Sequence, residues 1–434
     1  MRRPINTKEE LLHNKFADVA DAAHTQVYDK VIVGGGMAGL QSAYEILRAA
    51  KKADKPFKVV VVADKINSPA QAGSNVVMGL DGYEEDKYAD PNAFAPQDKA
   101  ILKQIKQAAG HVKAIVWKEK IDCRFSSGYQ MIGDDPKTVK GAADWLADTF
   151  GYRKDAFNFV PSSRINFKGY SSAMQSDAIG QINAPEYQRG LIDAIRRMGG
   201  TVVEGVNYTS HETAADGKIA VHTDHGTFQT TTPPLLATGA GHVQSLENGK
   251  LPIEFRTIYT GAMHIQLTPE DVKKVSPDGK PVAYCDTNLA GDVIWGSLDS
   301  KGVLTMGFGD SPVSEQQKNR MALRNKFSEI LPDIAGKYLD GELKNNVTYS
   351  YGGMLKAEND FPLVGRMANF DVMVGWASRG IVQSSAASQA YAQWAVNGND
   401  KGLKLWERLN AQCFAPAQQA GSKACLKVAA RSVG

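Results

Sequence analysis

Hydrophobic and polar positions follow their clearest pattern near the N-terminus. An apolar run at 31–33 precedes a glycine-rich turn, a stretch of helical periodicity comes next, and a second apolar run covers 59–62. Short apolar runs on both sides of a helix are typical of parallel strands that are buried on both faces. The pattern therefore predicts a strand–helix–strand unit from Tyr28 to Asp64.

The turn inside this unit has the glycine spacing of a dinucleotide-binding fingerprint. Gly34, Gly36 and Gly39 follow the pattern GxGxxG, and Asp64 ends the second strand. The first glycine permits a tight turn, the second lets a pyrophosphate approach the helix N-terminus, and the third allows close packing of helix on strand. An acid after the second strand can receive ribose hydroxyls. We expect a dinucleotide site here, although such glycines also occur for purely steric reasons.

The rest of the chain divides into helix–strand segments and a region of antiparallel strands. Helical periodicity recurs at 97–117 and 136–150, and a helix followed by a strand is expected within 184–205. From 254 to 308 short apolar strands succeed one another, which is typical of an antiparallel sheet. We expect an α/β protein with a Rossmann-like, doubly wound, mostly parallel sheet and an inserted antiparallel-sheet substrate domain.

A chain of 434 residues is too long for a single core, so we expect more than one domain. Glycine-rich elements at both ends of the chain indicate that the nucleotide-binding domain is assembled from separate pieces. The predicted boundaries are 1–26 for a polar leader, 27–120 with 180–250 and 345–400 for the nucleotide-binding domain, 121–179 with 251–344 for the substrate domain, and 401–434 for a C-terminal extension.

Charge and composition exclude several classes of protein. The net charge of +3 is small for this length and neither excludes nor suggests a nucleic-acid partner, although the basic run typical of a dedicated binder does not occur. No apolar stretch is long enough to span a membrane, and no apolar segment follows the two N-terminal arginines, so we expect a cytoplasmic protein without a membrane span. The cysteines have no metal-ligand spacing, so we expect neither a metal site nor a disulfide framework. They are Cys123, Cys285, Cys413 and Cys425.

Several separated segments follow one another along the chain in a characteristic order: GGGMAG with Asp64, AGSNVVMG, IDCRFSSG, LLATGAG, FRTIYTG, and NDFPLVG followed by VGWASRG. In their order and spacing together, these segments resemble the D-amino-acid oxidase superfamily of FAD-dependent oxidoreductases. The likeness covers most of residues 28–397.

The resemblance implies FAD as the dinucleotide. Further glycine-rich loops at 73–79 and 374–380 suit a backbone cradle around a permanently held ring. The segment YGGMLKAENDFP contains no cysteine, so we expect the flavin to be non-covalent. The residues expected to bind FAD are Gly34, Gly36, Met37, Ala38, Gly39, Asp64, Lys65, Gly73, Ser74, Asn75, Val206, Ala237, Thr238, Gly239, Gly365, Arg379, Gly380 and Ile381.

The implied reaction is hydride transfer from the C–N bond of a small amine or amino acid to the flavin, which needs no obligatory acid or base from the protein. Amino-acid oxidases of the family hold the substrate carboxylate with an arginine. The equivalent position here lies at or beside Leu355, and the nearest cation is Lys356. Arg379 is a candidate contact at the flavin edge, where a cation stabilises negative charge. Tyr259 and Tyr351 complete the catalytic candidates; a structural role remains open for each of the four.

Other functions fit the same residues. The triplet 378–380 resembles the loop of a tRNA-modifying oxidase domain, so oxidation of a tRNA-base side chain is one alternative. Oxidation of a 2-hydroxy acid is another, because fold alone does not choose the bond. A non-catalytic flavin-binding protein is the third. The sequence does not determine whether oxygen or a quinone is the electron acceptor, nor the oligomeric state.

Overall fold

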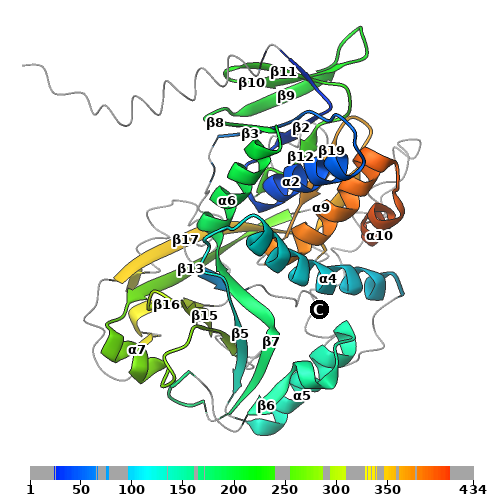
Figure 1. Cartoon of the computed structure of the whole chain (residues 1–434). Coiled ribbons are helices and arrows are strands. Elements are labelled where there is room, and N and C mark those ends of the chain that lie inside the picture. The colour runs from blue at the N-terminus through cyan, green and yellow to red at the C-terminus, as the bar shows by residue number, and fades with distance from the viewer. Residues whose placement is uncertain are drawn as a thin grey trace, which may run out of the picture.

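The structure, a computed structural model, describes residues 24, 26–64, 66, 75–77, 96–133, 135–160, 165–170, 172–239, 255–286, 294–308, 328–329, 331–333, 335–337, 339, 347–357, 361–376 and 379–410. A helical lobe and a large sheet lie on opposite sides of helix α4 (Pro96–Lys118), as Figure 1 shows. The predicted leader lies almost entirely outside the described residues. So do Lys65, Gly73 and Ser74.

The lobe is built on a six-stranded sheet whose strands are parallel except at one edge. The order is β18-β19-β12-β2-β3-β8, and β18 pairs with β19 in the antiparallel sense. The strands are β2 (Lys30–Val33), β3 (Val59–Ala63), β8 (Thr201–Glu204), β12 (Leu235–Leu236), β18 (Leu363–Arg366) and β19 (Asp371–Val374). The chain contributes to this sheet at both ends of the sequence, which confirms the predicted fold class.

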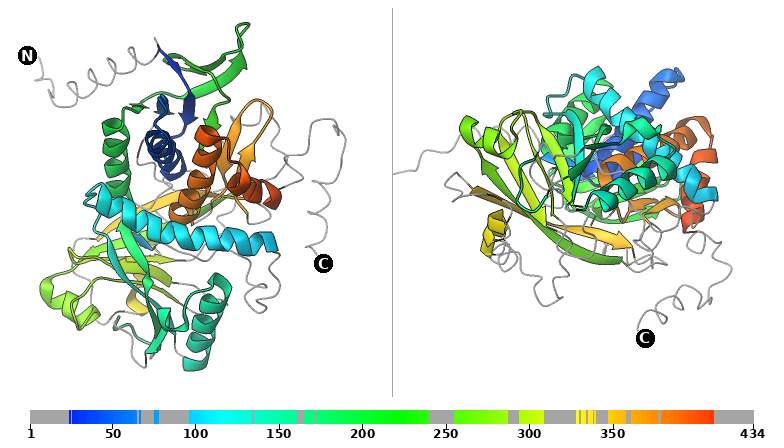
Figure 2. Two further views of the ribbon diagram at one scale, coloured as in Figure 1. Left: turned by 45° about the vertical axis from the view of Figure 1, so that its right-hand side comes forward. Right: turned by 90° about the horizontal axis from the view of Figure 1, so that it is seen from below.

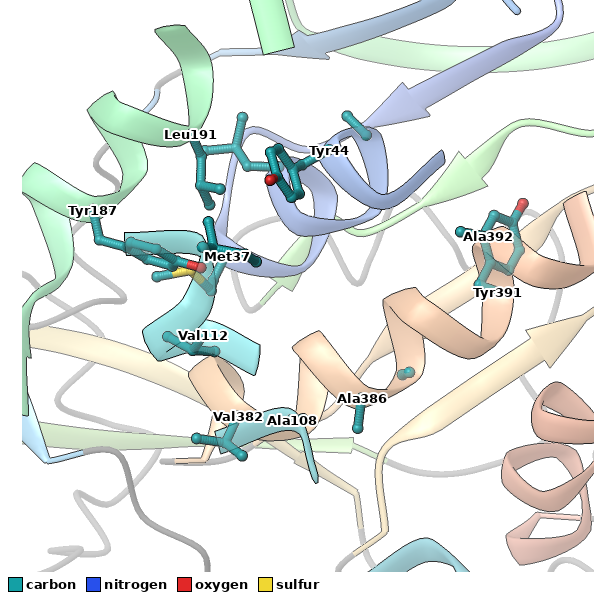
Figure 3. Packing of buried hydrophobic residues seen from close by; sticks show 14 of the residues in the cluster. Met37, Tyr44, Ala108, Val112, Tyr187, Leu191, Val382, Ala386, Tyr391 and Ala392 are labelled. Atoms are coloured by element: carbon teal, nitrogen blue, oxygen red, sulfur yellow. The ribbon is translucent and has the colours of Figure 1, made fainter. Parts of the chain in front are cut away.

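Both faces of the parallel sheet are buried, as the continuous apolar runs predict. Ile32 and Val61 face a core shared with the helices, whereas Val31 and Val60 face a smaller core beneath a second sheet. The helices of the lobe are α2 (Met37–Lys52), α6 (Ala184–Arg197), α9 (Gly380–Asn397) and α10 (Lys401–Leu409). Figure 3 shows how side chains from α2, α4, α6 and α9 meet in that core.

The second sheet covers the other face with four strands in the order β1-β11-β10-β9. These strands are β1 (Val27–Tyr28), β9 (Tyr208–Thr213), β10 (Ile219–Thr223) and β11 (Gly226–Thr230). A turn at 224–225 joins β10 and β11, which pair in the antiparallel sense as a hairpin.

The large sheet is the predicted antiparallel platform. Its order is β17-β13-β16-β15-β14-β5-β7-β4, with β6 paired to β7, and the β14–β5 pair is parallel. The strands are β4 (Asn75–Val77), β5 (Ser126–Gly133), β6 (Asn158–Val160), β7 (Ser172–Asn183), β13 (Phe255–Gln266), β14 (Val282–Asp286), β15 (Ile294–Leu298), β16 (Val303–Phe308) and β17 (Val347–Ala357). Figure 2 shows the platform from below, beside the lobe.

Local capping signals explain where the platform's helices begin and end. Asp135 accepts hydrogen bonds from two backbone N–H groups at the start of α5 (Pro136–Phe150), and Gly151 ends the helix in the left-handed conformation. Thr268 caps α7 (Pro269–Val275) by accepting one backbone N–H group, that of Asp271. A short 3-10 helix, η2, covers Lys154–Ala156.

The predicted domain boundaries stay predictions. Strand β7 runs without a break across position 180, and β17 pairs along its length with β13 of the platform. Helix α10 of the predicted C-terminal extension packs on the lobe through the buried Leu403 and Trp406. No helix in the described part of the chain combines the length and apolar character needed to cross a membrane.

A buried ion pair joins β2 to β19 at their amino-terminal ends. Lys30 Nζ donates to Asp371 Oδ2 at 3.0 Å and to the carbonyl of Pro233 at 2.6 Å. Tyr391 of α9 donates to the same carboxylate at 2.5 Å. Burial lowers the pKa of Lys30 and raises that of Asp371, since each loses water around its charged form, while their attraction opposes both shifts.

We expect Lys30→Met to lower the free energy of unfolding by about 3–5 kcal/mol, because it leaves the Asp371 carboxylate buried without its cation. Urea unfolding followed by circular dichroism measures the loss. The matched control is Lys218→Met, which removes an exposed pair with Asp216 and is expected to cost under about 1 kcal/mol. Equal midpoints for the two variants would show that the buried pair contributes no more than the exposed one.

Candidate active site

The glycine turn between β2 and α2 is shaped by contacts that exclude any side chain. Gly34 has φ +117°, and a Cβ there would lie 2.3 Å from the carbonyl oxygen of Ala237. A Cβ on Gly39 would lie 1.9 Å from the carbonyl oxygen of Gly34. Both positions therefore require glycine, for the reasons that the sequence predicts.

Gly36 differs, because a Cβ there would meet no atom within 4 Å. It precedes α2 in an extended conformation, with no side-chain cap and no acid in the first turn of the helix. The first N–H groups of α2 and the positive end of its dipole are thus left to an anion. Thr238 Oγ1 is also buried without a hydrogen-bond partner among the described residues. These groups fit a dinucleotide pyrophosphate.

The other predicted lobe residues follow the carboxyl ends of the parallel strands. Asp64 comes directly after β3, and the N–H groups of Gly205 and Val206 bond the carbonyls of Asp64 and Ala63. The segment 237–239 follows β12, whose partner β2 leads into the glycine turn. In open α/β sheets this edge is where ligands bind.

Helix α9 begins beside α2. Gln41 of α2 donates to the carbonyl of Ile381 at 3.0 Å and accepts a hydrogen bond from Ser384 at 2.5 Å. Arg379 stands at the N-cap of α9, followed by Gly380, and the first turn carries no acid. The structure thus brings the predicted residues of α9 to the glycine turn, and a second helix N-terminus with them.

Two further predicted positions lie apart from this group, and two others follow the glycine turn directly. Gly365 is in edge strand β18, opposite Val372 and below the carboxyl edge. Asn75 begins β4 in the platform and pairs with Asn183. Met37 and Ala38, in the first turn of α2, are buried. Their roles in binding stay predictions.

The platform has two faces, and the three catalytic candidates on its strands do not share one. In the continuous antiparallel register of β13 and β17, Lys356 is opposite Arg256, Tyr259 is opposite Gly353, and Tyr351 is opposite Gly261. Because residues alternate between faces, Lys356 belongs to one face and both tyrosines to the other. The structure therefore separates Lys356 from Tyr259 and Tyr351.

Packing shows which face adjoins the lobe. Met263 and Ile265, on the tyrosine face, lie in a core with α7. The opposite face carries a row of register partners formed by His264, Thr305, Ser297 and Ala283. Of these, Ala283 belongs to the core of the lobe helices. Lys356 is thus on the lobe side of the platform.

His264 is the titratable group of this row. Its ring nitrogen Nδ1 lies 3.1 Å from Thr305 Oγ1, and burial lowers the pKa of His264 to about 4. The imidazole is therefore neutral near pH 7. Ser297 Oγ, two strands away, is buried without a partner among the described residues. The row from His264 to Ala283 is therefore buried and uncharged near pH 7.

Trp295 is a candidate wall residue that sequence reasoning missed. It lies on the same face as Ser297, and a Cβ on Gly307 would come within 2.2 Å of its ring. The indole therefore lies across Gly307 of β16. Strand β15 packs against β4, the strand of Asn75. A glycine inside a strand often marks such a close approach, which is the signal that could have indicated Trp295.

Arg124 joins the platform to the lobe. Its Nη1 lies 2.9 Å from Asp299 Oδ2 in the β15–β16 turn, and its Nη2 lies 2.8 Å from Glu186 Oε1 on α6. Arg124 adopts φ +51°, a left-handed conformation that is uncommon outside glycine. Asp299 also accepts the N–H groups of Lys301 and Val303. The guanidinium therefore fixes the turn that follows Trp295.

Comparison with protein families decides the identity of the fold. The chain matches the family of FAD dependent oxidoreductases, DAO, over residues 29–394. It belongs to this family. The protein is thus an FAD-dependent oxidoreductase, in agreement with the glycine turn and the open N-terminus of α2.

Solved structures resemble the oxidoreductase over most of its length. Glycine oxidase from Bacillus cereus ATCC 14579 has a TM-score of 0.65 at 15% identity and covers 87% of this chain and 97% of its own. L-proline dehydrogenase from P. horikoshii has a TM-score of 0.62 at 14% identity, and the match covers 89% of this chain and 99% of the dehydrogenase chain. L-amino acid deaminase from Proteus myxofaciens has a TM-score of 0.61 at 15% identity, and the match covers 86% of this chain and 90% of the deaminase chain. At such identities the likeness shows the fold alone. No curated protein sequence matches.

We expect Gly36→Ala to weaken FAD binding by at least about tenfold, because the new methyl group would occupy the space through which the pyrophosphate approaches. Titration of apoprotein with FAD, followed by flavin fluorescence, measures the change. The apoprotein should keep its urea midpoint, since Gly36 is extended and a Cβ there meets no atom. Gly110→Ala, at another open glycine on the exposed side of α4, is the control and should bind FAD normally. Normal affinity in Gly36→Ala would place the pyrophosphate elsewhere.

A second prediction concerns acid stability. The folded pKa of His264 is about 4 and its unfolded value about 6.5, so the unfolded chain binds more protons between these values and stability falls as pH falls through them. We expect His264→Gln to remove about 2 kcal/mol of the stability difference between pH 7 and pH 5. Urea unfolding at both pH values measures it. His225→Gln, at an exposed hairpin histidine, is the control for the loss of a histidine as such. The same loss in wild type and His264→Gln would contradict the prediction.

Proposed function

We propose that the oxidoreductase transfers a hydride from the C–N bond of a small amine or amino acid to FAD. The single observation that carries this proposal is the lobe-side face of the platform, with neutral His264 and the indole of Trp295, set beside a lobe that fits FAD. The similar solved structures, which include a glycine oxidase and an L-proline dehydrogenase, support the same substrate class.

The chemistry asks little of the protein besides position and the exclusion of water. FAD, when bound, supplies the two-electron acceptor. The C–H bond beside nitrogen would break with both its electrons, which pass with the hydrogen to FAD, and the nitrogen lone pair would form the C=N bond of an iminium ion, which water then hydrolyses to a carbonyl compound and an ammonium ion. An amine can act in this way only in its neutral form. The described central strands carry no carboxylate on this face, and the imidazole of His264 is neutral. Such a face favours the neutral amine, because desolvation disfavours the ammonium ion.

Arg379 is proposed to act at the flavin edge. It precedes α9 at the point where Gln41 joins this helix to α2. A cation together with the positive end of a helix dipole stabilises negative charge that develops nearby during reduction. The protein is proposed to work in the cytoplasm on a small molecule. Its electron acceptor is oxygen or a quinone.

The proposal predicts which compounds bleach the flavin. Anaerobic holoenzyme mixed with primary and secondary amines, amino acids and 2-hydroxy acids should lose its absorbance near 450 nm with at least one nitrogen compound and with no hydroxy acid. Amines that lack a C–H bond beside nitrogen, such as 2-aminoisobutyrate, are the matched control and should leave it unchanged. Bleaching by hydroxy acids alone would assign the enzyme to C–O bonds. No bleaching at all would refute the proposed substrate class.

A further inference from the structure

Helix α4 has one apolar face and one basic face. The apolar face packs in the core of the lobe helices through residues that repeat at three- and four-residue steps, namely Ile101, Ile105, Ala108, Val112 and Ile115. Positions 99–118 of the helix contain five lysines and no Asp or Glu. Of these lysines, those at 99, 103 and 118 are exposed, and those at 106 and 113 are half-buried. In the left view of Figure 2, α4 crosses the front of the molecule between the lobe and the platform.

The acid that follows the helix is turned toward the lobe. Glu119 accepts hydrogen bonds from Tyr44 of α2 at 2.9 Å and from Arg197 of α6 at 2.8 Å, and its side chain is largely buried. Lys118 Nζ also lies 3.6 Å from this carboxylate. Arg197 is itself more than half exposed. Two cations thus share one carboxylate, and a net positive charge remains at this end of the helix.

The lysines within the helix contact neutral groups. Lys106 Nζ donates to the carbonyl of Gly151 at 2.5 Å, and Lys113 Nζ donates to Ser127 Oγ at 3.4 Å. Helix α5, which packs beside α4, balances its own charge with exposed residues of both signs, Lys137, Lys140, Asp144 and Asp148. The basic face of α4, formed by the lysines at 99, 103, 106 and 113 and by Trp117, therefore keeps its positive charge.

Trp117 places an exposed aromatic ring on this basic face. It is 69% exposed, and Phe159 of β6 is the other large apolar side chain that stands exposed in the described part of the chain. Lys113 Nζ lies 5.9 Å from the ring centroid of Trp117 and 5.8 Å from that of Phe125. An indole has an apolar body and a polar N–H, and it is favoured where an apolar phase meets water. Lysines around an exposed indole are typical of helices that lie on membranes.

We propose that the basic face of α4 binds the surface of an anionic lipid membrane, with Trp117 at the level of the headgroups. A helix of 23 residues offers a straight row about 35 Å long, which suits a plane of diffuse negative charge. All the cations of positions 99–118 are lysines, which act as point charges, whereas recognition of nucleic-acid phosphates favours bidentate arginine. The apolar face of α4 stays in the core, so binding is electrostatic, shallow and reversible. This proposal does not rest on the proposed function.

Sedimentation of the full-length holoenzyme with lipid vesicles tests the charge. We expect binding to vesicles of equal parts phosphatidylglycerol and phosphatidylcholine, and not to phosphatidylcholine alone. Binding should weaken as salt rises from about 50 mM to about 500 mM, because salt screens exposed charges. Lys103→Gln with Lys113→Gln should weaken it by about twentyfold to thirtyfold, about fivefold for each lysine. Lys273→Gln with Lys280→Gln, at exposed lysines on and after α7, removes the same charge elsewhere and is the matched control.

Fluorescence tests the place of the indole. Anionic vesicles should shift the tryptophan emission of wild type to shorter wavelength, because Trp117 leaves water for the headgroup region. Trp117→Phe should lose this shift, whereas Trp394→Phe, at a half-buried tryptophan of α9, should keep it. A shift that persists in Trp117→Phe would overturn the proposed orientation of the face.

Other outcomes would overturn the proposal as a whole. Equal vesicle binding in wild type and the α4 double variant would do so, as would an equal loss in the α7 control, which would make net charge the cause. Binding to tRNA that displaces the vesicles and depends on Lys103 and Lys113 would assign the face to nucleic acid instead. Melting temperatures confirm that each variant is folded. Because no step of the test uses turnover, its result stands even if no nitrogen compound bleaches the flavin.

Discussion

Three backbone segments meet at the start of α2, and the closeness of that contact determines where cofactor chemistry can occur. Gly39 packs against the carbonyl of Gly34, and Gly34 packs against the carbonyl of Ala237. With no Cβ between them, β2, α2 and β12 converge at one edge of the sheet. Gln41 then ties α9 to the same place, so two helix N-termini without acidic first turns face one region.

The platform is set against this region by polar contacts as well as by packing. Arg124, in the connection between α4 and β5, reaches both the β15–β16 turn and the first turn of α6. Asp299 is almost fully buried there, so its ion pair is screened less than a surface pair. Because Asp299 also holds the turn's own N–H groups, one arginine links the shape of that turn to the position of the lobe.

Features encoded by neighbouring residues were predictable from the sequence, and features that depend on distant pairing were not. The glycine turn and α5, with Asp135 before it and Gly151 after it, follow from local rules that act within a few residues. The pair of Lys30 with Asp371 joins positions 341 apart, and no local pattern reveals it. Periodicity of two shows which residues of β13 share a face, but the face that meets the lobe depends on packing. Tyr259 and Lys356 could therefore not be assigned to opposite faces beforehand.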